Sequence, residues 1–140
     1  MDQRISLVTL GVGDLRRARA FYAALGWRGQ EVEETVFFQA GAMALVLWDR
    51  GKLAAASGLP ASWSGFDGVT LAQNVRSTTE VDEIVAAARD AGAEVTRAPA
   101  PTFYGGYAGV FLDPDGHAWE IAFNPGFALD DDGALVLPEF

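Results

Sequence analysis

Hydrophobic and polar residues alternate along the first part of the chain in a pattern that predicts a strand, a helix and then three short strands. The strand is expected over Ile5–Val12, which is rich in β-branched and apolar residues. Asp14 suits the N-cap of the next helix, because its side chain can accept a hydrogen bond from a free backbone N–H. Gly26 stands where a helix commonly ends. The apolar stripe of this helix is Leu15, Ala18, Tyr22 and Leu25. The short β-rich runs are Arg28–Val32, Thr35–Gln39 and Met43–Trp48.

The second part of the chain repeats this order of elements. A strand is predicted over Val69–Val75, and Ser77 with Glu80 has the spacing of a capping box. Gly92 would end the helix that carries the stripe Val81, Ile84, Val85 and Ala88. Further strands are predicted at Glu94–Ala98, Tyr107–Leu112 and Ala118–Phe123. We therefore expect an α+β fold of tandem βαβββ modules in a single domain, residues 1–140. Module one covers about residues 5–48, a linker 49–68, module two about 69–124 and a tail 125–140.

Length and composition narrow the class of protein. The chain has 140 residues, 50% of them hydrophobic, which is enough for one domain with a real core. It has no cysteine, which excludes disulfides, thiolate metal ligands and a cysteine nucleophile. Its apolar runs are shorter than the roughly 18 residues of a membrane-spanning helix. The polar start at Met1–Ile5 does not resemble a signal peptide, so a cytoplasmic protein is expected.

The net charge of −9 is concentrated in one part of the chain. Residues 1–64 hold seven basic and six acidic residues, whereas residues 65–140 hold three basic and thirteen acidic residues. Such an acidic surface repels phosphate groups, so neither nucleic acid nor an anionic membrane is an expected partner. A small-molecule ligand is expected instead.

Two segments carry a family resemblance: VTLGVGDLRRARAFYAALGW (Val8–Trp27) and FLDPDGHAWEI (Phe111–Ile121). Together with the repeat, residues 5 to 124 resemble the vicinal oxygen chelate superfamily, which holds glyoxalase I, extradiol dioxygenases and the bleomycin-resistance proteins. The resemblance implies curled mixed sheets that enclose a cavity, usually within a homodimer. The apolar residues of the tail could dock on the second subunit.

The metal ligands that the resemblance implies are largely missing. The family holds a divalent metal with two histidines and a glutamate, and the matching positions here are Leu7, the region of Thr70, and Glu120. The sole histidine, His117, stands three residues before Glu120, and this spacing on a strand places two side chains on opposite faces. We expect His117 to be exposed at a turn. No metal ion and no cofactor are predicted, although an oxygen-only Mg²⁺ or Ca²⁺ site stays open.

Strand alternation sorts the remaining polar residues. With Glu120 in the cavity, Trp119 belongs to the core. Leu7 and Thr9 in the first strand, and Thr70 and Asn74 in the matching strand, would line the same cavity. Glu120 has two interpretations, a catalytic general base or ligand partner, and a structural remnant that Thr, Asn or water satisfies.

Aromatic residues cluster where a ligand could be bound. Aromatic walls with few polar groups are typical of small-molecule pockets, whereas core and dimer packing is the alternative. Trp63, in the linker, could act as a lid. The remaining candidates are Trp48, Phe103, Tyr104 and Tyr107.

Three functions follow from these observations. The first is metal-free binding of a small hydrophobic or aromatic molecule, for example to sequester an antibiotic. The second is a glyoxalase-like lyase or dioxygenase, either metal-dependent or with Glu120 as general base. The third is a partner-binding domain that uses the acidic second half.

Overall fold

The computed structural model describes residues 1, 3, 5–62, 66–67 and 69–139, and divides the chain into two compact units. Unit one is Met1–Asp67 and unit two is Gly68–Phe140. The boundary lies at the end of the segment 49–68, which the sequence predicts to be a linker. Trp63 lies outside the described residues.

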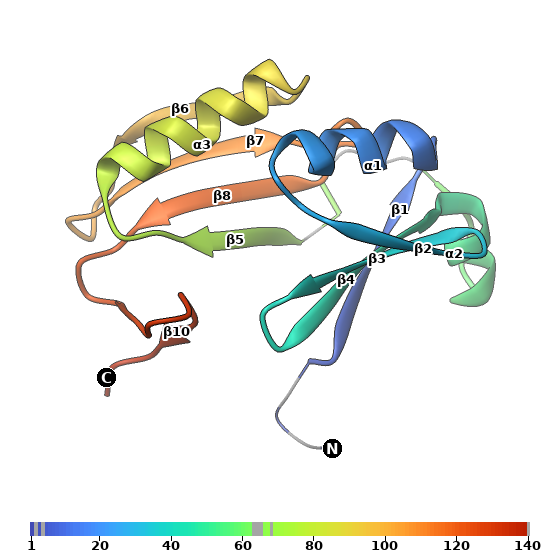
Figure 1. Cartoon of the computed structure of the whole chain (residues 1–140), viewed down its shortest axis with the longest axis horizontal. Helices are drawn as coiled ribbons and strands as arrows, with labels where there is room; N and C mark the ends of the chain where they lie inside the picture. Colours follow the sequence, from blue (N-terminus) through green and yellow to red (C-terminus); the bar gives the residue numbers. More distant parts are fainter. Residues whose placement is uncertain (2, 4, 63–65, 68, 140) are drawn as a thin grey trace. The chain divides into compact units, whose positions relative to one another are not determined.

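Unit one is a curled four-stranded sheet with a helix on one face (Figure 1). Its strand order is β1-β4-β3-β2, with β1 parallel to β4 and the other neighbours antiparallel. The elements are β1 (Leu7–Val12), α1 (Leu15–Ala24), β2 (Gly29–Val32), β3 (Thr35–Ala40), β4 (Met43–Asp49) and α2 (Arg50–Ala56).

Local chemistry explains where α1 begins and ends. The Asp14 side chain accepts a hydrogen bond from the Arg17 backbone N–H at 3.0 Å, as expected for an N-cap. Gly26 follows the helix with a φ of 91°, a left-handed conformation that strains other residues. Between these ends, α1 packs Ala18, Phe21 and Tyr22 against the sheet. The strand residues that are buried on the side of α1 are Leu10, Val12, Val36, Phe38, Leu45 and Leu47.

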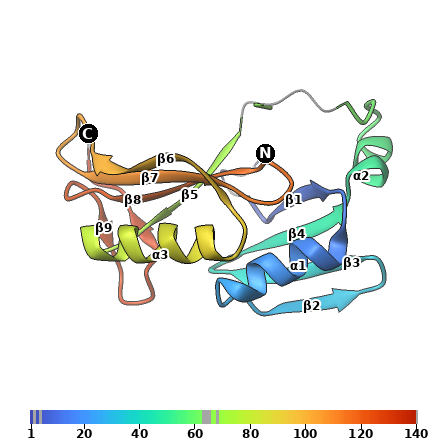
Figure 2. The same cartoon turned by 90° about the horizontal axis from the view of Figure 1, so that it is seen from above.

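Unit two repeats this plan with a longer helix (Figure 2). Its strand order is β5-β8-β7-β6, again with one parallel pair, β5 with β8. The elements are β5 (Thr70–Asn74), α3 (Thr78–Asp90), β6 (Glu94–Pro101), β7 (Tyr107–Leu112), β8 (Ala118–Phe123), β9 (Ala128–Leu129) and β10 (Leu135–Val136).

The capping box predicted for α3 is present with one difference. The Ser77 hydroxyl accepts from the Glu80 backbone N–H at 3.2 Å, while the Glu80 carboxylate accepts from the backbone N–H of Arg76, one residue before the cap, at 2.8 Å. The helix buries Val81, Val85 and Ala88. Each of the two valine side chains stabilises the fold by about 1.5–3 kcal/mol when it is fully buried. Facing them in the sheet are Phe111, Trp119 and Ile121.

The α+β fold of tandem βαβββ modules is thus confirmed, with two additions that the pattern did not predict. The expected linker contains α2, and the expected tail contains the short β9–β10 hairpin. The Arg76 guanidinium holds this hairpin, because it donates hydrogen bonds to the carbonyl oxygens of Leu129 and Asp130. Among the described residues, no helix is both long and apolar enough to cross a membrane.

Candidate functional site

Glu120 lies on the face of the second sheet opposite α3. Its neighbours in the sequence, Trp119 and Ile121, are buried on the helix side, so strand alternation turns Glu120 to the other face. Ala72 of β5 and Val110 of β7 stand directly beside it in the sheet register. The carboxylate is therefore surrounded by small aliphatic side chains.

Thr70 and Asn74 share this face with Glu120. In the parallel pair β5–β8, Thr70 stands beside Ala118 and Asn74 beside Ala122, and both alanines are two positions from Glu120. Thr70 is exposed and Asn74 is half-buried. We call this surface, with Ala72, Ala118 and Ala122, the Glu120 face. The structure therefore places three of the residues singled out by sequence on one face.

The Glu120 carboxylate is half-buried, and within the described part of the chain it makes neither a hydrogen bond nor an ion pair. A carboxylate has room for several hydrogen bonds, and a partly dehydrated one gains most from a charged donor. Thr70 and Asn74 also make no side-chain hydrogen bond to described residues. The Glu120 face thus presents polar groups that a ligand could bind.

Leu7, Thr9 and Trp48 share the corresponding open face of the first sheet. In the register of β1 with β4, Thr9 stands beside Val46, and Leu7 and Trp48 lie two positions away along their own strands. Their side chains therefore point to the same face of the sheet. Leu7 is 47% exposed, and Trp48 is half-buried. This face is mainly apolar, and a bound aromatic molecule could contact it.

The turn between β6 and β7 separates the other three aromatic candidates. The Phe103 side chain is fully exposed, and its ring contacts that of Tyr104 edge-on, at a centroid distance of 5.3 Å. Tyr107 lies on the α3 side of the sheet, where its hydroxyl donates a hydrogen bond to Asp82 Oδ1 at 2.7 Å. The structure therefore does not bring Tyr107 to the Glu120 face. The hydrogen bond to Asp82 is the main reason that the pKa of Tyr107 is raised above 10.0.

His117 is not the turn-exposed residue that the sequence suggests, because only 18% of its side chain is accessible. Its Nδ1 lies 2.7 Å from Oδ2 of the buried Asp113. The other oxygen of Asp113 accepts hydrogen bonds from the backbone N–H groups of Asp115 and His117, each at 2.9 Å. The DPDG motif is thus a closed turn whose buried carboxylate fixes the start of β8, the strand that carries Glu120.

The donor groups do not fit a divalent metal at the positions that the family resemblance implies. A leucine side chain has no lone pair, so Leu7 cannot be a ligand, and the neutral hydroxyl of Thr70 is a weak one. Glu120 alone offers a charged ligand there, whereas catalytic sites commonly use three protein ligands. Among the described residues, no group of three or more His, Cys, Asp or Glu side chains could hold a metal ion.

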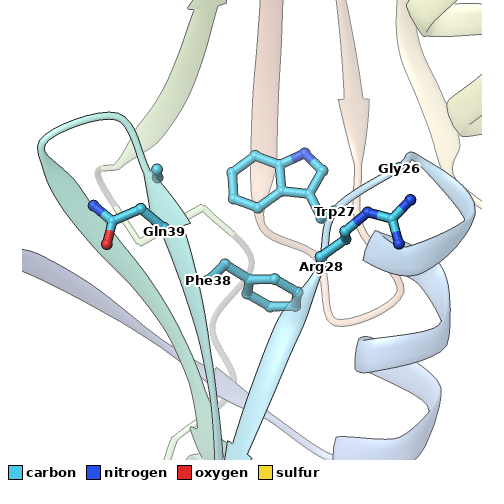
Figure 3. Close-up of a pocket in the computed structure, with 6 residues that line it drawn as sticks. Gly26, Trp27, Arg28, Phe38 and Gln39 are labelled. Carbon is cyan, nitrogen blue, oxygen red and sulfur yellow. The ribbon is translucent and has the colours of Figure 1, made fainter.

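A pocket of about 400 Å³ in the first unit was not predicted from the sequence (Figure 3). It opens where β2 separates from β3, and its lining residues are Gly26, Trp27, Arg28, Phe38, Gln39 and Ala40. In the view of Figure 3 the Trp27 indole lies above the Phe38 ring, and the Gln39 side chain points away from both rings. A signal was present in the sequence, since a tryptophan and an arginine directly follow the glycine that ends α1.

Comparisons with known proteins agree with this architecture. Residues 4–121 match the model of the Glyoxalase/Bleomycin resistance protein/Dioxygenase superfamily. The search of curated proteins gave no match. Among solved structures, a glyoxalase-related enzyme from Fulvimarina pelagi is 33% identical with a TM-score of 0.89, over 98% of this chain and 99% of that one. The hypothetical protein SA1046 from S. aureus is 27% identical with a TM-score of 0.78, over 88% of this chain and 94% of that one.

Proposed function

Because the chain belongs to the Glyoxalase/Bleomycin resistance protein/Dioxygenase superfamily, we propose that it binds a small hydrophobic or aromatic molecule on the Glu120 face without a metal ion. The role that fits such binding is sequestration of an antibiotic-like compound. One observation carries the proposal: a half-buried carboxylate, without a partner among the described residues, lies among alanine and valine side chains.

The chemistry of this face selects a class of ligand. Ala72 is exposed and Ala118 is half-buried, and their short side chains let a planar apolar body approach the sheet closely. The carboxylate of Glu120 favours a cationic or hydrogen-bond-donating group on that body. Residues 68–140 contain three basic and twelve acidic residues, so the field of this unit also attracts cations. A planar aromatic cation is the ligand we expect.

Two acridine dyes of similar shape test the proposal. Proflavine is a cation at neutral pH and acridine is neutral, and the binding of each is followed by dye fluorescence and by thermal shift of the protein. We expect Glu120→Gln to weaken proflavine binding about tenfold, the loss typical of one charge-assisted hydrogen bond. Acridine binding should change little.

A matched control separates a local contact from general charge. Glu83→Gln removes the same charge from an exposed position on α3, on the opposite side of the sheet from Glu120. Proflavine affinity should stay at the wild-type value in this variant. If neither dye binds the wild-type protein, or if both variants weaken proflavine equally, the proposed site is wrong.

The metal-free part of the proposal has its own measurement. Purified protein is dialysed against Zn²⁺, Mn²⁺, Ni²⁺, Fe²⁺ or Mg²⁺, and the retained ion is counted by elemental analysis. We expect no stoichiometric ion, because Glu120 is the sole carboxylate at the implied ligand positions. About one ion per chain, lost in Glu120→Ala, would overturn this part.

A second candidate function is an enzyme in which Glu120 acts as general base, and the similarity to the glyoxalase-related enzyme from Fulvimarina pelagi favours it. A base must lie within hydrogen-bond reach of the proton that it removes, and the half-buried carboxylate, which pairs with no described residue, allows this. Glu120→Gln keeps the shape of the side chain but cannot accept the proton. Once a substrate is identified, unchanged turnover in this variant would exclude the candidate.

A further inference from the structure

The pocket beside Trp27 results from an abrupt end of strand pairing. The register of β2 with β3 starts at the pair Gly29–Phe38, and the residues just before Gly29 leave the sheet to join α1. A Cβ atom on Gly29 would lie 2.5 Å from Val36 Cγ1 and 2.7 Å from Phe38 Cε1, so only glycine allows this approach. The pocket is therefore formed by the path of the backbone, which leaves the sheet just before Gly29.

Two aromatic residues, Trp27 and Phe38, line the pocket, and the buried Tyr22 packs against both of them. Tyr22, Trp27 and Phe38 contact one another with ring centroids 5.6 to 5.8 Å apart, in tilted and edge-on arrangements. Tyr22 and Phe38 are 1% exposed, whereas Trp27 remains half-buried at the pocket. The Trp27 backbone N–H also donates to the Tyr22 carbonyl at 2.9 Å, which holds the loop against α1.

Arg28 adds a positive charge to the lining of this pocket. Its side chain is exposed, and it forms no ion pair or hydrogen bond with any residue that the structure describes. Arg19 and Lys52 of the same unit instead pair with Glu31 and Glu34 at 2.6 and 2.5 Å. A guanidinium is well suited to bind a carboxylate through two parallel hydrogen bonds.

We propose that this pocket is a second ligand site, one that takes a planar aromatic carboxylate. The ring packs against Trp27, the half-buried aromatic residue of the lining, in front of the buried Phe38, and the carboxylate binds Arg28. A volume of about 400 Å³ suits a molecule of one or two rings. Residues 1–67 hold seven basic and seven acidic residues, so this unit does not repel anions as the acidic second unit does. The ligand class is thus opposite in charge to the class expected at Glu120.

The test uses naphthoate and its neutral isostere naphthamide. The indole N–H resonances of the four tryptophans are assigned with single Trp→Phe variants and followed by NMR during titration. We expect naphthoate to shift the Trp27 signal most and to bind about tenfold more tightly than naphthamide, since the amide lacks the charge that Arg28 binds. Arg28→Gln should remove this preference.

Two controls keep the result specific. Arg16→Gln removes an exposed arginine of α1 that does not line the pocket, and it should leave the naphthoate affinity unchanged. Glu120→Gln should also leave the naphthoate affinity unchanged. The proposal for this pocket and the proposal for the Glu120 face can therefore fail independently. The proposal is overturned if Trp27 does not respond to naphthoate, if both probes bind equally, or if Arg28→Gln and Arg16→Gln have the same effect.

Discussion

The buried carboxylate of Asp113 offers a direct test of how the turn before β8 is held. The Asp113→Ala variant removes the acceptor of two backbone N–H groups, those of Asp115 and His117, and the partner of His117 Nδ1. The Asp113 side chain is fully buried, so water does not replace the carboxylate freely. Each hydrogen bond to a charged group contributes about 1.5–3 kcal/mol, and His117 regains part of its loss from solvent. We therefore expect the free energy of unfolding to fall by about 3–5 kcal/mol.

Asp130 provides a matched control with the same local geometry. Its Oδ1 also accepts two backbone N–H groups, those of Asp132 and Ala134, at 3.0 and 2.8 Å. Asp130 is exposed, so water takes over these bonds, and Asp130→Ala should cost only about 0.5–1 kcal/mol. The difference between the two variants isolates the effect of burial from the effect of hydrogen-bond number.

Urea unfolding followed by circular dichroism measures both variants, and the dependence of the free energy on urea concentration should stay unchanged if the transition remains the same. Asp113→Asn should be intermediate, because the amide keeps the oxygen that accepts the two backbone bonds. Equal losses for Asp113→Ala and Asp130→Ala would refute the reasoning. Proflavine binding should also weaken in Asp113→Ala, since the turn positions the strand that carries Glu120.

Two further predictions concern β7 and the turn before it. Gly106→Ala should destabilise the protein by about 1–3 kcal/mol in the same urea assay, because the added methyl would overlap the Phe123 carbonyl oxygen. Gly105→Ala, where a φ of 79° strains the backbone but space is open, should cost about 1 kcal/mol, and a larger loss there would contradict the steric argument. Tyr107→Phe tests the hydrogen bond to Asp82: the pKa of Tyr107 is raised in the folded state, so the tyrosine stabilises the protein below its unfolded pKa. The stability difference between wild type and Tyr107→Phe should therefore shrink as the pH rises from 10.0 through the folded pKa, and a constant difference would argue against the contact.

The amino-acid sequence alone determined the main helices and strands of the two modules and the class of fold. Asp14 and Ser77 begin the helices where predicted, since an N-cap acts within one turn and needs no distant partner. Alternation likewise separated Trp119 from Glu120, because side chains on a strand point to opposite faces whatever surrounds them. The family resemblance followed from the same local motifs, and the match over residues 4–121 confirms it.

Tertiary structure decided which of these local features meet. Tyr107 lies on the α3 side of the sheet, where it contacts Asp82, in the register that pairs it with Phe123. The pattern of neighbouring residues along the chain does not predict that register. His117 is held because chain reversal at the turn brings it back to Asp113. The pocket beside Trp27 exists because the pairing of β2 with β3 stops at Gly29. Caps and alternation depend on neighbours along the chain, whereas pockets and buried partners depend on segments that only folding brings together.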